Sequence, residues 1–242
     1  MEQLFNYEAI VSLFTLALLE IVLGIDNVIF ISIICGKVAP QEREKARRIG
    51  ILLALFVRIS LLTGIQWLTT LTEPIFTLLQ IEFSWKSIIL LAGGLFLIYK
   101  SVREIHDKLE GDNENEILLK NMRLAEAIIQ IIMIDIVFSF DSILTAVGLS
   151  RQIVIMIIAV IIAMIMMLIY AKKIGDFVDE HPTVKMLALA FLVMIGFLLI
   201  TESFGKHIEK GYVYFAMLFA LSVELMNMKM TKNKRKRLIK HE

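Results

Sequence analysis

Apolar residues dominate long stretches of this chain and are interrupted at intervals by short polar segments. A helix that crosses a bilayer needs about 20 mostly apolar residues, and residues 153–171 meet this need without a charged side chain. Six further apolar windows reach a similar length with polar interruptions. The pattern predicts seven transmembrane helices, at about residues 9–35, 51–71, 86–103, 123–148, 152–171, 185–203 and 210–228.

The composition agrees with a membrane protein. The 242 residues are 58% hydrophobic and have a mean hydropathy of +0.77, outside the range of soluble globular domains. Pro40, Pro74 and Pro182 all fall between predicted helices, where residues that break helices are expected. The first apolar segment lacks a basic leader and a small-residue cleavage site, so we expect it to be retained.

Lys and Arg are distributed unevenly between alternate connections. They are abundant after the first, third and fifth predicted helices and in the tail, whereas the opposite side receives only Lys86, Arg151, Lys206 and Lys210. Cytoplasmic loops are enriched in these residues. We therefore predict an outside N-terminus and a cytoplasmic C-terminus. Residues 229–242 form a basic cytoplasmic tail, for which contact with anionic lipid is the expected role.

Two short segments repeat one polar pattern inside apolar sequence. Residues 20–27 read Glu-Ile-Val-Leu-Gly-Ile-Asp-Asn, and residues 135–142 read Asp-Ile-Val-Phe-Ser-Phe-Asp-Ser. In each segment a carboxylate precedes an aspartate by six positions, and a small hydrogen-bonding residue follows at once. An ionisable group at the centre of a membrane helix costs at least about 2.5–3.5 kcal/mol, so such groups are usually functional. The two matching sets predict a site for a cation.

The two segments lie in the first and the fourth predicted helices, which indicates an internal repeat. A unit of three helices crosses the membrane an odd number of times, so its copy must enter from the opposite side. Such inverted repeats occur in secondary transporters with sites near the midplane. We predict an all-α transmembrane domain over residues 1–228, with one repeat at about 9–103, a second at about 123–203 and an extra helix at about 210–228.

Helical geometry separates the two carboxylates of each motif. Residues six apart on a regular helix point about 120° apart and lie about 9 Å apart along the axis, so one ion cannot contact both. Either each motif is locally unwound, with Gly24 and Ser139 as the weak points, or the carboxylates form successive sites. The order predicted for successive sites, from the outside inward, is Asp141, then Glu20 with Asp135, then Asp26.

Oxygen is the ligand atom that the predicted helices offer to an ion. All four histidines lie in loops or the tail and Cys35 is alone, and oxygen ligands suit Mn²⁺, Ca²⁺ or Mg²⁺ rather than Zn²⁺ or Cu⁺. Arg58 is expected to pair with one of the acids or to face a wet cavity. The structural alternative is that the acids only pair with Arg58, or bond between helices while protonated. The predicted ligands are Glu20, Asp26, Asn27, Asp135, Asp141 and Ser142, with Thr145, Arg58, Glu202 and Glu224 as accessory candidates.

Residues 19–30 and 135–148 closely resemble the signature of the TerC family of integral membrane proteins, and the resemblance covers nearly the whole chain. It implies about seven helices, a distant relation to LysE-type exporters, a place in the bacterial cytoplasmic (inner) membrane and Mn²⁺ efflux, as in several members. The residues that occupy motif positions by this resemblance are Glu20, Asp26, Asn27, Asp135, Asp141 and Ser142. The family is named for tellurium resistance, but carboxylates would repel the tellurite anion, so we expect any such phenotype to be indirect.

The favoured hypothesis is a secondary transporter that exports Mn²⁺ or another hard divalent cation, carried as substrate rather than held as a prosthetic group. Two alternatives stay open: a membrane-embedded scaffold that delivers metal to secreted proteins or assembles them, and an exporter of small organic cations. The sequence has no phosphate-binding glycine loop, nucleophile motif or His–Cys metal centre, so we expect neither an enzyme nor an ATP-driven pump. Nucleic-acid binding is not expected, because lipid explains the basic tail better. The metal, the coupling ion, the direction of transport and the oligomeric state, a homo-oligomer included, are left open.

Overall fold

The computed structural model describes residues 7–78, 81–110, 122–149, 152–206 and 208–239. Within these residues, seven helices have 21 residues or more. They are α1 (Tyr7–Gly36), α2 (Arg43–Thr63), α4 (Trp85–Leu109), α6 (Leu124–Leu149), α7 (Ile153–Glu180), α8 (Pro182–Ser203) and α9 (Lys210–Ile239). Each coincides with one predicted helix. Four are long and apolar enough to cross a membrane by length and composition alone: α1, α7, α8 and the Gly211–Thr231 part of α9. The crossing of all seven stays a prediction.

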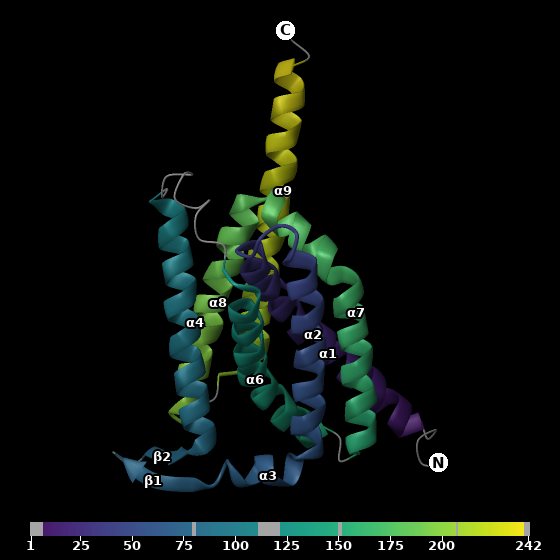
Figure 1. Ribbon diagram of the computed structural model, residues 1–242, viewed down its shortest axis with the longest axis vertical. Helices are drawn as coiled ribbons and strands as arrows, with labels where there is room; N and C mark the ends of the chain where they lie inside the picture. The colour runs from purple at the N-terminus through teal and green to yellow at the C-terminus, as the bar shows by residue number, and fades with distance from the viewer. Residues whose placement is uncertain (1–6, 79–80, 111–121, 150–151, 207, 240–242) are drawn as a thin grey trace.

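The long helices form one bundle in which helices distant in sequence are neighbours (Figure 1). The most extensive contacts join α1 to α7, α4 to α8 and α6 to α2. Each of these pairs takes one helix from each predicted repeat. The start of α1 and the short elements between α2 and α4 lie at one end of the molecule, and α9 ends at the other (Figure 1).

The backbones of α4 and α8 approach each other closely, and glycines make this possible. A Cβ added at Gly94 would lie 2.6 Å from the carbonyl oxygen of Gly196, and one added at Gly196 would lie 2.8 Å from that of Gly94. Small residues at helix interfaces allow such packing in membranes, where van der Waals contact stabilises association. Elsewhere the connections are short: α7 and α8 are joined by the single residue His181.

Several helix boundaries differ from the prediction. The helix predicted over 51–71 begins earlier, at Arg43, and is broken at Gly64, because glycine has a low helix propensity. A short helix, α3 (Ile65–Thr70), follows it. The helices α4, α7 and α9 continue into polar residues, and α9 runs through most of the predicted basic tail. Hydropathy locates the apolar part of a helix and not its ends.

The all-α prediction also needs one addition, a β-hairpin. Strand β1 (Pro74–Leu78) pairs antiparallel with β2 (Ile81–Ser84), so Pro74 lies in a strand rather than in an irregular connection. Phe76 and Phe83 are opposite each other, with ring centroids 5.3 Å apart. Cross-strand aromatic pairs of this kind stabilise a short hairpin. The hairpin and α3 together form the link between α2 and α4.

Both polar motifs lie in uninterrupted helix. The helix α1 continues through Gly24 and α6 continues through Ser139, so the structure does not show the local unwinding considered above. Gly24 instead makes room for a neighbour, because a Cβ there would lie 2.8 Å from the Sδ and Cε atoms of Met167 in α7. The glycine thus serves the α1–α7 contact.

Candidate ion site

Three helices bring charged side chains together in the interior of the bundle. Glu20 of α1, Arg58 of α2 and Asp135 of α6 expose only 2%, 2% and 5% of their surface. Nη1 of Arg58 donates a hydrogen bond to Oε2 of Glu20 at 2.6 Å, and Nη2 donates to Oδ1 of Asp135 at 3.0 Å. The first carboxylates of the two motifs therefore converge on one guanidinium, and we call Glu20, Arg58 and Asp135 the central cluster.

Ser139 of the second motif completes the hydrogen bonding of the central cluster. Nε of Arg58 donates to Oγ of Ser139 at 2.9 Å, and that hydroxyl donates to Oδ2 of Asp135 at 3.1 Å. Ser142 lies nearly one turn further along α6, and its hydroxyl donates to the carbonyl oxygen of Ser139 at 3.4 Å. A buried charge is tolerated only when it is paired and hydrogen-bonded, and these contacts meet that condition.

The charges in the central cluster do not balance. Arg58 carries one positive charge and touches two carboxylates, so the cluster is left with one negative charge when both acids are ionised. We expected Arg58 to pair with one of the acids, and in the structure Arg58 pairs with both Glu20 and Asp135. Since an uncompensated buried charge costs several kcal/mol, this arrangement favours a further cation or a proton nearby.

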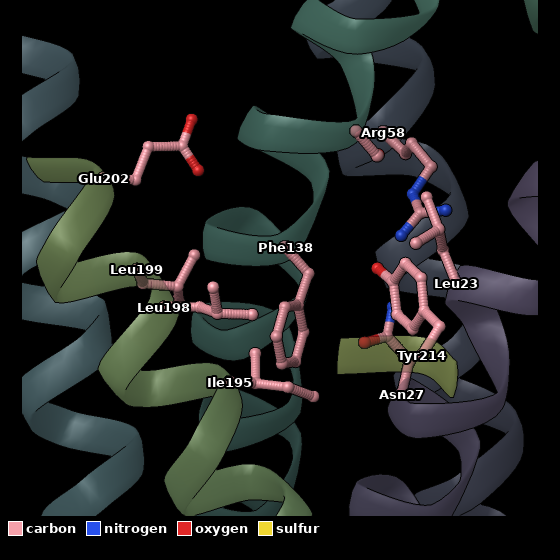
Figure 2. Close-up of a pocket in the computed structure, with 10 residues that line it drawn as sticks. Leu23, Asn27, Arg58, Phe138, Ile195, Leu198, Leu199, Glu202 and Tyr214 are labelled. Carbon is pink, nitrogen blue, oxygen red and sulfur yellow. The ribbon is translucent and has the colours of Figure 1, made fainter. Parts of the chain in front are cut away.

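A cavity lies beside the central cluster, between α1, α6, α8 and α9 (Figure 2). Its polar lining consists of Asn27, Arg58, Ser142, Glu202 and Tyr214, and we call it the Asn27 cavity. Figure 2 shows Arg58 and Asn27 on one side, Glu202 on the other and Phe138 between them. Its volume of about 50 Å³ has room for a few water molecules.

Asn27 is the unusual group in this cavity. Its side chain is buried and its Oδ1 atom has no hydrogen-bond partner among the residues that the structure describes. An unsatisfied buried polar atom costs about 1–3 kcal/mol. A cation or a hydrogen-bond donor that binds this oxygen would recover that free energy. Glu202 across the cavity accepts a hydrogen bond from Nζ of Lys86 at 3.0 Å, which ties α4 to α8. Glu224 of α9 does not belong to the described lining.

Comparison with known proteins identifies the family of this chain. The family model described as "Integral membrane protein TerC family" matches residues 5–238. The chain belongs to the TerC family. It is similar to the "UPF0053 inner membrane protein YgdQ" of Escherichia coli strain K12, with 51% identity over 214 residues that cover 88% of this chain and 90% of that protein. A "UPF0053 protein" of Haemophilus influenzae is 50% identical over 224 residues, covering 92% and 94%.

A longer relative shows that the TerC region also occurs within larger proteins. The "UPF0053 inner membrane protein YoaE" of Escherichia coli strain K12 is 44% identical over 228 residues, which are 94% of this chain but 44% of that protein. No solved structure matches the chain. The relatives and the apolar helices identify this TerC protein as a multi-pass inner membrane protein.

Three predicted ligands of the TerC protein cannot be placed as side chains. Asp26 lies in α1, and Asp141 and Thr145 lie in α6, but their side chains are outside the described part of the structure. Among the side chains that are described, no three His, Cys, Asp or Glu residues are grouped so as to hold a metal ion. The series of successive sites formed by the four motif carboxylates therefore stays a prediction. Ser139, treated from sequence only as a weak point of the helix, is instead a partner of Arg58, and its position four residues after Asp135 was the available signal.

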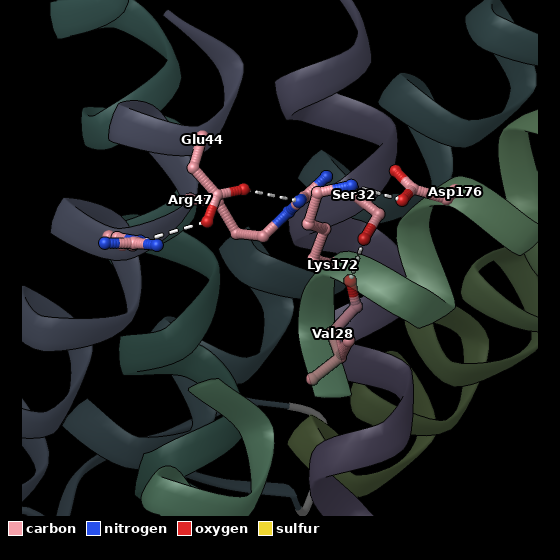
Figure 3. A network of polar contacts seen from close by, with 7 residues as sticks. Val28, Ser32, Glu44, Arg47, Lys172 and Asp176 are labelled. Atoms are coloured by element: carbon pink, nitrogen blue, oxygen red, sulfur yellow. Dashed lines mark hydrogen bonds and ion pairs between the residues drawn. The ribbon is translucent and has the colours of Figure 1, made fainter. Parts of the chain in front are cut away.

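A second buried arginine lies closer to the end where α1 terminates (Figure 3). Nη1 of Arg47 donates to Glu44 at 3.2 Å, while its buried Nε atom has no hydrogen-bond partner within the ranges described above. A Cβ at Gly175 of α7 would lie 2.8 Å from both Nη2 of Arg47 and Oγ of Ser32. The glycine thus lets Arg47 pass between α1, α2 and α7. The hydrogen bonds of Arg47, Ser32 and Lys172 drawn in Figure 3 each stay within one helix, and they add no carboxylate to the central cluster.

Proposed function

We propose that this TerC protein is a secondary transporter that exports a hard divalent cation, with Mn²⁺ as the first candidate, across the bacterial cytoplasmic membrane. The observation that carries the proposal is the convergence of both motifs on Arg58 beside a cavity with an unpartnered amide oxygen. Carboxylate, hydroxyl and amide oxygens are the ligands of hard cations. The family membership supports a membrane role of this kind.

In this proposal Arg58 acts as a built-in counter-ion. It holds Glu20 and Asp135 when no ion is bound, and an arriving cation competes with it for their oxygens. Asp26, Asn27, Asp141 and Ser142 supply the further ligands. Because Arg58 is fixed in α2 and the two acids lie in α1 and α6, exchange of partners would couple ion binding to the relative position of three helices.

The helix contacts support an inverted repeat of α1, α2 and α4 with α6, α7 and α8. Exchanging the two repeats turns the α1–α7 contact into the α6–α2 contact and leaves the α4–α8 contact unchanged. These are the three most extensive contacts in the described bundle. An inverted repeat allows one half to rock against the other around a fixed site, which exposes that site to alternate sides.

Purified protein in liposomes tests this function directly. We expect Mn²⁺ flux by the unchanged protein, and a loss of about tenfold or more in Asp26→Asn and in Asp141→Asn, since each removes a charged ligand. Glu126→Gln is the matched control, because Glu126 is an exposed acid in the first turn of α6. Undiminished flux in both Asn variants would contradict the proposed site. Mn²⁺ binding without any flux would favour the scaffold that delivers metal.

Selectivity is tested in the same liposomes. Hard oxygen ligands are expected to favour Mn²⁺, Ca²⁺ or Mg²⁺ over an organic cation such as a basic amino acid. The inhibition of Mn²⁺ flux by each competing cation ranks their affinities. Stronger inhibition by the organic cation would favour an exporter of small organic cations. We expect the protein to need no prosthetic group and its basic tail to contact anionic lipid.

A further inference from the structure

A second cavity lies between α1, α4, α6 and α8, near the end at which α4 terminates. Its volume of about 30 Å³ has room for about two water molecules. The polar lining consists of Lys37, Lys100, Ser101, Glu104 and Gln130, and we call it the Ser101 cavity. Ser101 is 1% exposed, and no hydrogen-bond partner of its Oγ atom lies in the described part of the chain. Each of the two cavities thus contains one buried oxygen that lacks a partner.

The Asn27 and Ser101 cavities follow one another along the same three helices. The helices α1, α6 and α8 line both. On α1 the first cavity reaches Asn27 and the second begins at Phe30, three residues or about 4.5 Å further along the axis. On α6, which runs in the opposite direction, Gln130 lines the second cavity and Phe138 the first. The two linings are thus separated by about one helical turn on α1 and by eight residues, or about 12 Å, on α6, so the cavities lie in succession along these helices.

A lysine–glutamate ion pair occurs at each cavity. Glu202 of the Asn27 cavity pairs with Lys86, and Glu104 of the Ser101 cavity pairs with Lys37. The carboxylates expose 15% and 14% of their side chains, whereas the lysines expose 25% and 41%. A lysine ammonium is a point charge on a flexible stem, and ion pairs with solvent access are weak. A divalent cation that reaches either carboxylate would compete with the lysine for its oxygens.

Both glutamates lie in the C-terminal halves of their helices, α4 and α8. Glu104 lies 18 positions after Lys86, which is in the first turn of α4, and Glu202 lies 17 positions after Lys185, which is in the first turn of α8. Because α4 and α8 exchange places in the inverted repeat, one carboxylate falls at each of the two cavities. The ion pairs do not follow this symmetry fully. Lys86 of α4 pairs with Glu202 of α8, but Lys185 of α8 pairs with Asp179 and not with Glu104 of α4.

We propose that the two cavities are the vestibules of the ion route, with Glu202 and Glu104 as the first ligands at its two mouths. Lys86 and Lys37 occupy these carboxylates until a divalent cation displaces them. The unpartnered oxygens of Asn27 and Ser101 then provide the next contact on the way inward. This inference rests on the proposed transport function and extends it to four charged residues outside the two motifs.

Access of a small cation to the cavities can be measured without transport. Cys35 is the only cysteine of the chain, so Cys35→Ala provides a background for Asn27→Cys and Ser101→Cys. Ag⁺ is added to sealed vesicles of either orientation, and the free thiol that remains after denaturation is quantified by mass spectrometry. We expect Ag⁺ to protect the two cysteines from opposite faces of the membrane.

Ser32→Cys is the matched control, because Ser32 is also 1% exposed but lines neither of the two cavities. Its thiol is expected to stay unprotected from both faces. Protection of the Asn27→Cys and Ser101→Cys thiols no greater than in this control, or protection of both thiols from the same face, would overturn the proposal. This readout does not depend on flux, so it separates failure of the vestibules from failure of the transport function.

Flux through the two mouths distinguishes an ion ligand from a structural ion pair. Glu202→Gln and Glu104→Gln are expected to raise the Mn²⁺ concentration for half-maximal flux about tenfold. Lys86→Met and Lys37→Met are expected to lower that concentration, because the competing charge is gone. Glu110→Gln, which alters an exposed acid just after α4, should leave it unchanged. Equal impairment by loss of the lysine and loss of the glutamate would overturn the proposal.

Discussion

Each of the three guanidinium nitrogens of Arg58 donates a hydrogen bond to a described side chain. Its Nε, Nη1 and Nη2 atoms donate to Ser139, Glu20 and Asp135, which come from two other helices. A planar guanidinium suits such a site because its donors diverge in fixed directions, whereas a lysine offers one point charge. Arg58 therefore orders α1, α2 and α6 relative to one another.

Replacement of Arg58 by methionine tests this ordering role. Arg58→Met leaves two buried carboxylates without their cation, and breaking a buried pair in this way costs about 3–5 kcal/mol. We expect the unfolding midpoint in detergent to fall, as measured by thermal or denaturant unfolding. The triple variant that adds Glu20→Gln and Asp135→Asn should recover part of the loss. Unchanged stability in Arg58→Met would mean that the contacts contribute little.

Ser139 should be sensitive in a way that an exposed serine is not. Ser139→Ala removes a hydroxyl that joins Arg58 to Asp135 and leaves a buried donor unpaired, at a cost of about 1–3 kcal/mol. Ser222→Ala on α9 removes only a bond to a carbonyl of the same helix at an exposed position, so the same unfolding measurement should find it near neutral. Equal effects of the two changes would contradict the network.

At the scale of the elements, the α4–α8 contact depends on glycine more than on large side chains. A Cβ at Gly196 would lie 2.7 Å from Cγ1 of Ile98 and 2.8 Å from the carbonyl oxygen of Gly94. A side chain can change its rotamer, but the Gly94 backbone can move only if α4 moves. Ion pairing between Lys86 and Glu202 crosses the same interface near one end.

Two Gly→Ala changes should therefore affect the free energy of unfolding in different ways. Gly196→Ala is expected to destabilise the protein by about 1–3 kcal/mol through overpacking. Gly211→Ala in α9 meets nothing within 4 Å, so the higher helix propensity of alanine should make it neutral or stabilising by up to about 1 kcal/mol. Unfolding midpoints of the two variants compare these effects directly, and tolerance at Gly196 would show that α4 and α8 can separate freely.

Hydropathy predicted the existence of each long helix but not its ends. Lengths of apolar sequence carry no information on the polar turns at the start of α2 or the end of α7. The hairpin was also missed, because the alternation of Phe76 with its neighbours extends over only a few residues. Short strands of this kind are stabilised by pairing across the turn, which no single segment reveals.

The convergence of Glu20 and Asp135 followed from the repeated motif, and the involvement of Arg58 followed from charge. The partners Ser139 and Lys86 did not follow, since they depend on the rotation of α6 and on which helix lies beside α4. Side-chain periodicity fixes a face of a helix and not its neighbour. The depth order of Asp26 and Asp141 stays a prediction.

At the scale of the whole molecule, the charge distribution predicts orientation. The polar connections with many Lys and Arg residues alternate with poor ones along the chain, and the bundle brings the end of α9 to the end of the molecule opposite the hairpin (Figure 1). In bacteria such asymmetry sets the direction of insertion. The predicted result is a cytoplasmic C-terminus and a hairpin on the outside.

Reporter fusions test this orientation. A fluorescent protein that folds only in the cytoplasm should be bright when attached after residue 242, and alkaline phosphatase at the same place should be inactive. Alkaline phosphatase inserted after Glu73, an exposed residue before the hairpin, should be active because it reaches the oxidising side. The reverse pattern at both places would invert the predicted topology and exchange the two mouths of the ion route.

The single-residue joint between α7 and α8 has a mechanical consequence. Because His181 alone joins the two helices, a tilt of α8 away from α4 must also move α7. A movement of α7 would in turn move α1, with which it makes its most extensive contact. The corresponding joint between α2 and α4 contains α3 and the hairpin, which can absorb displacement. The α7–α8 half of the molecule would thus be the more rigid half. A displacement caused by ion binding would then be transmitted mainly through α8, α7 and α1.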